Sequence, residues 1–197
     1  MVNDGSLDDT AKIARDAGAM VIDLPYNMGI GSAVQTGFIL AKERQYDAVL
    51  RLDGDGQHRP KEVKNLLAPI LEDRADVVVG SRFLSGAGFR STIPRRMGIG
   101  LFSFLLALTT GKKATDPTSG FQVMNNRAIN FFVKEYPPEY PEVEARILAH
   151  KAGLRVEEVP TVMVERTGVE SSINFYNSVY FVLEVFISTI VSAFRKF

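Results

Sequence analysis

Short apolar runs alternate with amphipathic segments over the first 80 residues of the chain. The apolar runs are bounded by polar or glycine-containing breakers, which is typical of buried strands, and they cover 20–24, 47–53 and 76–82. The segments between them carry apolar residues at helical spacing and cover 6–19, 31–45 and 60–73. This alternation predicts an α/β fold in which helices cover a parallel sheet. Ser6 is expected to cap the first of these helices, and Pro60 to begin the third.

Beyond Ser81 the alternation becomes irregular. An apolar helix is predicted over 95–111, which is too short to cross a bilayer because a spanning helix needs about 20 apolar residues. Strands are expected over 120–124 and 154–166, with a helix over 141–153 between them.

The C-terminal stretch, 173–197, is long and mostly apolar, and it ends in basic residues. We expect residues 1–172 to make up one domain. Residues 173–197 are expected to form a helix that lies at a membrane interface or binds a partner, and a membrane-spanning helix is the less favoured interpretation.

Composition narrows the class of protein. The 197 residues carry a formal net charge of zero, so the overall charge predicts no nucleic-acid partner. The chain has no cysteine, which excludes disulfides and thiolate metal sites and fits a reducing compartment. The polar, acidic start of the chain does not resemble a signal peptide.

Charge is unevenly distributed along the chain. Between Asp76 and Asp116 there is no acidic residue, although this span contains several arginines and lysines and the apolar segment 95–111. One interpretation is a buried helix with a solvated basic loop. The other is a surface for a ligand that is both anionic and lipidic.

Two carboxylates follow the apolar run 47–53. Asp53 and Asp55 are one residue apart, so in extended backbone their side chains point the same way. Gly54 and Gly56 leave room for a bulky ligand. Because ligands bind at the carboxyl ends of strands in open α/β sheets, these oxygen ligands suit Mg²⁺ or Mn²⁺ carrying a substrate diphosphate. A plain Asp-Gly turn is the alternative.

Several motifs resemble one enzyme family when taken together. "LDGDGQH", "GSR", "DPTSGFQVMN" and "EVPTVMVERTGVESSI" are similar to motifs of the inverting family 2 glycosyltransferases. The likeness is strongest to polyprenyl-phosphate (dolichol-phosphate) mannose and glucose synthases and to bacterial polysaccharide transferases, and it covers essentially the whole chain. It implies a GT-A fold, which is a Rossmann-like three-layer sandwich, and a nucleotide-diphosphate sugar as donor.

The resemblance also implies roles for individual residues on the donor side. Asp53 and Asp55 match the motif that holds the metal and the diphosphate, and Gln57 matches a third metal ligand. His58 either supports these ligands or has a capping or packing role. The expected donor-binding residues come from "VNDGS", "NMGIGSAVQTG" and the loop after the last strand: Asp4, Gly5, Ser6, Asn27, Gly29, Gly31 and Arg166.

On the acceptor side, Arg82 is expected to face the acceptor, and Arg96 to hold the acceptor phosphate, with Arg95 as its alternative. The "D-x-T-S-G-F" segment, which contains Asp116, Ser119 and Gly120, is expected to line the same side.

The need for a catalytic base depends on the acceptor. A lipid phosphate is already an anion at neutral pH, so positioning and charge stabilisation suffice. A sugar hydroxyl requires a carboxylate to take its proton. Glu142 of "YPEVEA" matches the position of the family's base, with Glu144 as its neighbour. The alternative is an acid-rich helix N-terminus.

The chain departs from the family pattern at its start. Family members have a first strand and helix before "V-x-D-G-S", whereas Met1 stands directly before this motif here. We therefore expect an N-terminally truncated domain with an unpaired strand edge: a fragment, a chain with a misassigned start, or a protein that completes its sheet in another way. If the chain is a full-length product, impaired stability and weak donor binding are expected.

The sequence thus predicts an inverting, metal-dependent glycosyltransferase. It would use Mg²⁺ or Mn²⁺ and transfer a sugar to a polyprenyl phosphate or a saccharide acceptor, and it would be attached peripherally to the cytoplasmic face of the membrane. The alternative is an impaired fragment that acts as a partner or regulatory subunit, and a homo-oligomer is also possible.

Overall fold

The computed structural model describes residues 1–84, 93–138, 141–164, 187 and 191, with backbone alone at 93–95. The strands are β1 (Val2–Asn3), β2 (Ile22–Asp23), β3 (Ala48–Arg51), β4 (Val77–Ser81), β5 (Gln122–Asn125) and β6 (Val156–Pro160). The helices are α1 (Thr10–Asp16), α2 (Ile30–Glu43), α3 (Val63–Leu71), α4 (Ile93–Thr110), α5 (Asn126–Glu135) and α6 (Pro141–Lys151). A 3₁₀ turn, Pro60–Glu62, leads into α3 and has its proline at the first position, as predicted.

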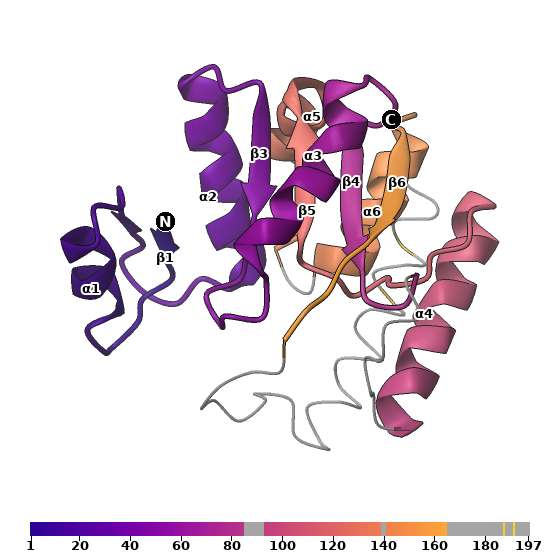
Figure 1. Cartoon of the computed structure of the whole chain (residues 1–197), viewed down its shortest axis with the longest axis horizontal. Helices are drawn as coiled ribbons and strands as arrows, with labels where there is room; N and C mark the ends of the chain where they lie inside the picture. Colours follow the sequence, from indigo (N-terminus) through magenta and orange to yellow (C-terminus); the bar gives the residue numbers. More distant parts are fainter. Residues whose placement is uncertain (85–92, 139–140, 165–186, 188–190, 192–197) are drawn as a thin grey trace.

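The main sheet is mixed, with strand order β3-β5-β4-β6. β4 and β6 are parallel, whereas β5 runs antiparallel to both β3 and β4. β3 and β4 lie in the first part of the chain, where a parallel sheet was predicted, and they run the same way, whereas the later strand β5 is reversed. The reason is that the connection from β4 through α4 leaves and re-enters the sheet at the same end, so β5 must run backwards (Figure 1).

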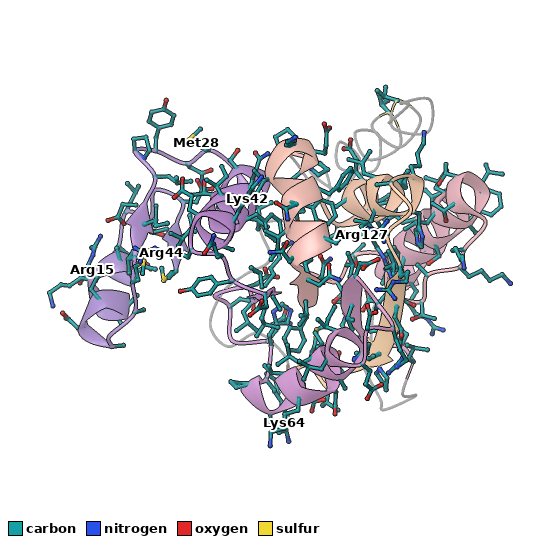
Figure 2. All side chains as sticks on the ribbon, turned by 90° about the horizontal axis from the view of Figure 1, so that it is seen from above. Arg15, Met28, Lys42, Arg44, Lys64 and Arg127 are labelled. Carbon is teal, nitrogen blue, oxygen red and sulfur yellow. The ribbon has the colours of Figure 1, made fainter. Side chains whose placement is uncertain are left out.

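Helices cover both faces of this sheet. Seen from above, the helix that carries Lys64 lies on one side, and the helices that carry Lys42 and Arg127 lie on the other (Figure 2). β4 is buried along its whole length, and its valines alternate between the two faces. Val77 and Val79 pack in the core under α2 and α5, whereas Val78 packs with Leu66 of α3. The chain therefore has the predicted three-layer arrangement.

α4 packs beside the sheet rather than on either of its faces (Figure 1). Phe102 and Leu106 on its inner side form a separate apolar cluster with Val143 and Ile147 of α6. This contact fixes the start of α6, where the predicted base Glu142 lies.

β1 and β2 form a small parallel sheet of their own. Among the described residues, no hydrogen-bonded ladder joins this pair to β3, and α2 lies between the two sheets (Figure 1).

Two local predictions are corrected by the structure. Ser6 does not cap α1, because the helix begins at Thr10 after Asp9. The backbone N–H of Ser6 instead donates to the side chain of Asn3, and Asp8 accepts a bond from the backbone N–H of Thr10. α5 was not predicted, although Asn125 caps it by accepting a bond from the N–H of Ala128.

None of the described helices is long and apolar enough to cross a membrane. The predicted helix over 173–197 lies outside the described residues except for Ile187 and Val191, whose side chains are exposed. The division at residue 172 remains a prediction.

Asp76 is expected to make stability depend on acid pH. Its buried carboxylate accepts bonds from the side chains of Asn125, Arg127 and Arg155 and from the backbone of Arg155. Burial alone would raise the pKa of Asp76, but the bonds from Arg155 and Asn125 lower it. This contribution is complete above the unfolded pKa near 4 and is lost as pH falls through the lower folded pKa.

Urea unfolding between pH 6 and pH 2 measures this dependence. Asp76→Asn is expected to remove on the order of 2 kcal/mol at neutral pH and to flatten the loss of stability at acid pH. A variant with the same slope as the wild type would contradict this assignment.

Candidate functional site

The two predicted metal-binding carboxylates lie in a tight loop after β3. The backbone N–H of Asp53 donates to Nδ1 of His58 over 3.1 Å, and that of Gln57 donates to Oδ1 of Asp55 over 3.0 Å. A Cβ atom added at Gly54 or Gly56 would meet nothing within 4 Å, so the space over the loop is open. The loop is therefore held in shape by its own hydrogen bonds and is accessible to a ligand.

Asp53 and Asp55 fit a divalent cation whose remaining ligands come from a substrate and from water. The part of the chain that the structure describes contains no group of three or more acidic or histidine side chains placed to hold a metal. Mg²⁺ is commonly bound by one or two carboxylates, with substrate phosphates and waters completing its shell. Asp53 and Asp55 match that requirement, and Gln57 stays a predicted third ligand.

Gln57 and His58 connect the loop to the segment after β6. The side-chain amide of Gln57 donates to the carbonyl of Val164, and the N–H of Val164 donates to the carbonyl of Gln57, each over 3.1 Å. The His58 ring stacks on Phe121 with centroids 4.7 Å apart. Burial lowers the pKa of His58 although Asp53 and Asp55 raise it, and an accepting Nδ1 fits the neutral ring. His58 thus packs against the core and holds the backbone of Asp53.

The two predicted donor loops meet at the start of α2. Oδ1 of Asp4 accepts a bond of 2.7 Å from the N–H of Met28, the residue labelled on this lobe in Figure 2. Gly5 has φ +71°, and a Cβ there would lie 2.6 Å from the backbone nitrogen of Asn27. The side chain of Asn27 accepts a bond from the N–H of Gly29. Ser6, by contrast, is exposed.

Gly31 has a packing role that the sequence did not predict. Its N–H donates to the carbonyl of Pro138 over 3.1 Å, and a Cβ would lie 2.1 Å from the carbonyl oxygen of Pro137. The start of α2 is therefore pressed against the segment that leads into α6. This close approach brings the donor loops to the same region as Glu142.

Arg51 is a site residue that sequence reasoning missed. Its buried guanidinium donates to Glu142 over 2.6 Å and to the hydroxyl of Tyr136 over 3.0 Å, and it lies 3.5 Å from Asp53. A single arginine in a strand matches no motif. The signal is only that a charged residue interrupts an apolar run two positions before Asp53.

The predicted acceptor residues are built around a buried ion pair. Arg82 donates to both carboxylate oxygens of Asp116, each over 2.6 Å, and its backbone N–H donates to the same group over 3.1 Å. The hydroxyl of Ser119 donates to the carbonyl of Gly80 over 2.6 Å. A Cβ at Gly120 would lie 2.7 Å from Oδ2 of Asp53, so this segment borders the metal loop directly.

The remaining predicted residues lie further out or outside the described residues. Arg96 is exposed near the start of α4, and Glu144 lies partly buried in the first turn of α6. The side chain of Arg95 and all of Arg166 fall outside the described residues. The structure therefore gathers the donor loops, the carboxylates, Glu142 and the Arg82–Asp116 pair at the same end of the sheet.

Known proteins are similar to this chain in sequence. Residues 1–132 match the model of glycosyl transferase family 2. An undecaprenyl-phosphate mannosyltransferase of Micrococcus luteus is 30% identical over 183 residues, which is 88% of this chain and 74% of that protein. A UDP-N-acetylglucosamine–dolichyl-phosphate N-acetylglucosaminyltransferase of Methanococcus voltae is 29% identical over 81% of this chain and 72% of that protein.

A solved structure also has the same fold. Glucosyl-3-phosphoglycerate synthase of Mycobacterium tuberculosis, in complex with Mn²⁺, uridine-diphosphate-glucose and phosphoglyceric acid, matches with a TM-score of 0.72. The match covers 98% of this chain and 67% of that one at 20% identity, so it bears on the fold alone. The fold is GT-A, and the chain belongs to glycosyl transferase family 2.

Proposed function

We propose that this chain transfers a sugar, with inversion, from a nucleotide-diphosphate donor to a polyprenyl phosphate, and that it uses Mg²⁺ or Mn²⁺. The observation that carries the proposal is the open loop with Asp53 and Asp55, which borders the segment around Gly120. The similar transferase of Methanococcus voltae has a UDP sugar as its donor according to its name, which supports the nature of the donor, and the carboxylate pair suits a divalent cation.

The proposed reaction is a single displacement. An acceptor oxygen bonds to the anomeric carbon from the face opposite the diphosphate, and the bond to the diphosphate breaks with its electron pair on the leaving group. A divalent cation, when bound, offsets the charge that builds on that diphosphate. Asp53 and Asp55 would hold the cation, and the loops at Asp4 and Asn27 would bind the nucleotide.

The proposed acceptor is a lipid phosphate because both similar transferases named above act on one, according to their names. Such an acceptor needs no general base, since its attacking oxygen is already charged. A saccharide hydroxyl is the second acceptor class, for which Glu142 would be the base. The ion pair between Glu142 and Arg51 supports the first class, because that carboxylate already has a partner.

We also propose peripheral attachment to a membrane through α4. Four apolar side chains on its outer side are exposed and recur at helical spacing: Met97 (72%), Leu101 (38%), Phe104 (63%) and Leu108 (71%). Arg96 is exposed on the same helix. An exposed apolar row with basic residues nearby is typical of a helix that lies in a membrane interface, and the cytoplasmic face is the proposed side.

Calorimetric titration of UDP, GDP and dTDP into the chain, with Mn²⁺ and then with EDTA, tests the donor site. We expect one nucleotide to bind, and only with the metal. Transfer of the matching sugar to undecaprenyl phosphate and to a soluble saccharide then distinguishes the acceptor classes. A folded chain that binds none of the three nucleotides would overturn the proposal and favour a non-catalytic partner subunit.

A further inference from the structure

Arg51 is a buried cation that contacts carboxylates from two parts of the candidate site. Its side chain is 4% exposed. The same terminal nitrogen lies 2.6 Å from Oε1 of Glu142 and 3.5 Å from Oδ1 of Asp53. The other terminal nitrogen donates to the hydroxyl of Tyr136. One guanidinium therefore lies between a predicted metal ligand and the first turn of α6.

The charges in this cluster are well defined. Burial opposes the charge of Arg51, but the carboxylates of Glu142 and Asp53 raise the pKa of the guanidinium, so it stays a cation. Burial raises the pKa of Tyr136 to about 12, so its hydroxyl stays neutral and accepts the bond from Arg51. Two carboxylates thus share one buried cation.

Arg51 interacts more strongly with Glu142 than with Asp53. The guanidinium forms a close, charge-assisted bond with Glu142, whereas its separation from Asp53 is at the limit of a hydrogen bond. The carboxylate of Asp53 also lies close to the backbone of Gly120, where a Cβ would come within 2.7 Å of Oδ2 and within 3.0 Å of the same nitrogen of Arg51. Asp53, Arg51 and the backbone of Gly120 are therefore crowded together, while the carboxylate of Asp53 is only weakly engaged by Arg51.

We propose that Glu142 holds the guanidinium of Arg51 away from Asp53, so that this buried cation does not compete with a divalent cation for the carboxylate. The inference rests on the proposed function, because it assigns a role at the same metal site. Glu142 is a positioning residue in this account because it acts through Arg51, and neither residue touches the metal. Without the charge of Glu142, Asp53 is the remaining carboxylate that pairs with the guanidinium among the described residues, and the guanidinium then competes with the metal.

Mn²⁺ affinity of the whole chain, measured from the paramagnetic resonance signal of free Mn²⁺, tests this coupling. Glu142→Gln is expected to weaken Mn²⁺ binding about tenfold, which corresponds to about 1.4 kcal/mol. Arg51→Met combined with Glu142→Gln is expected to bind Mn²⁺ within about threefold of the wild type, because the competing cation is gone. Glu157→Gln is the matched control, since it breaks an arginine pair on β6, and it should leave the affinity unchanged.

Thermal unfolding shows whether each variant is folded. If Glu142→Gln alone fails to fold, the double variant still decides the question, because removing both members of a buried pair is far less costly than removing one. Unchanged Mn²⁺ affinity in folded Glu142→Gln, or a double variant that binds Mn²⁺ much more weakly than the wild type, would overturn the inference alone. A wild-type chain that binds no Mn²⁺ would remove the proposed metal site as well.

Discussion

Replacing Asp116 with alanine is expected to lower the free energy of unfolding by about 3–5 kcal/mol, because it removes the buried carboxylate that balances the charge of the buried Arg82 guanidinium. The carboxylate of Asp116 is fully buried and the side chain of Arg82 is 6% exposed, so water cannot readily replace the lost bonds. The same change removes the bond to the backbone N–H of Arg82, at the end of β4. Urea unfolding at neutral pH measures the loss.

Two further variants serve as controls for the loss of stability in Asp116→Ala. Asp16→Ala breaks the exposed pair with Lys12, whose side chains are 72% and 64% exposed, and should cost at most about 1 kcal/mol. Arg82→Met combined with Asp116→Leu should recover most of the stability, since both buried charges are gone. That double variant should nevertheless lose sugar transfer, because it lacks the proposed acceptor arginine. A loss below about 1 kcal/mol in Asp116→Ala would show that the pair contributes little to the fold.

The strands and most helices could be predicted because local pattern determines them. β4 lies within its predicted run, and its five residues are all buried, as a continuous run of valines suggests. The direction of β5 could not be predicted in this way. Its antiparallel course depends on where α4 returns the chain to the sheet, and the residues of β5 itself carry no sign of it.

In the candidate site, too, some residues could be found from a local sequence pattern and others could not. Asp53 and Asp55 could be found from the sequence because a glycine-flanked carboxylate pair after a strand is a local signal. The role of Arg51 could not, because it comes from Glu142, Tyr136 and the backbone of Gly120, which are distant in the sequence and meet only in the folded chain. Gly31 is similar: its motif suggested the donor, whereas its close contact is with Pro137 and Pro138.

Asp55→Asn is expected to reduce the rate of sugar transfer by about 10²–10³-fold, a loss comparable to removing one key stabilising group from an active site. Asparagine retains an oxygen that can accept the bond from the N–H of Gln57, so the loop keeps its shape while the metal loses a charged ligand. Initial rates at increasing Mn²⁺ measure the effect, and excess metal should restore part of the lost rate.

Asp47→Asn is the matched control for this variant. Asp47 is an exposed carboxylate just before β3, at the opposite end of the strand from the carboxylate loop. Its replacement should leave both the rate and the Mn²⁺ dependence unchanged. Equal rates in Asp55→Asn and the wild type at every Mn²⁺ concentration would show that the charge of Asp55 takes no part in metal binding. The two variants differ from the wild type by the same loss of one carboxylate charge, so a difference between them reports the position of that charge.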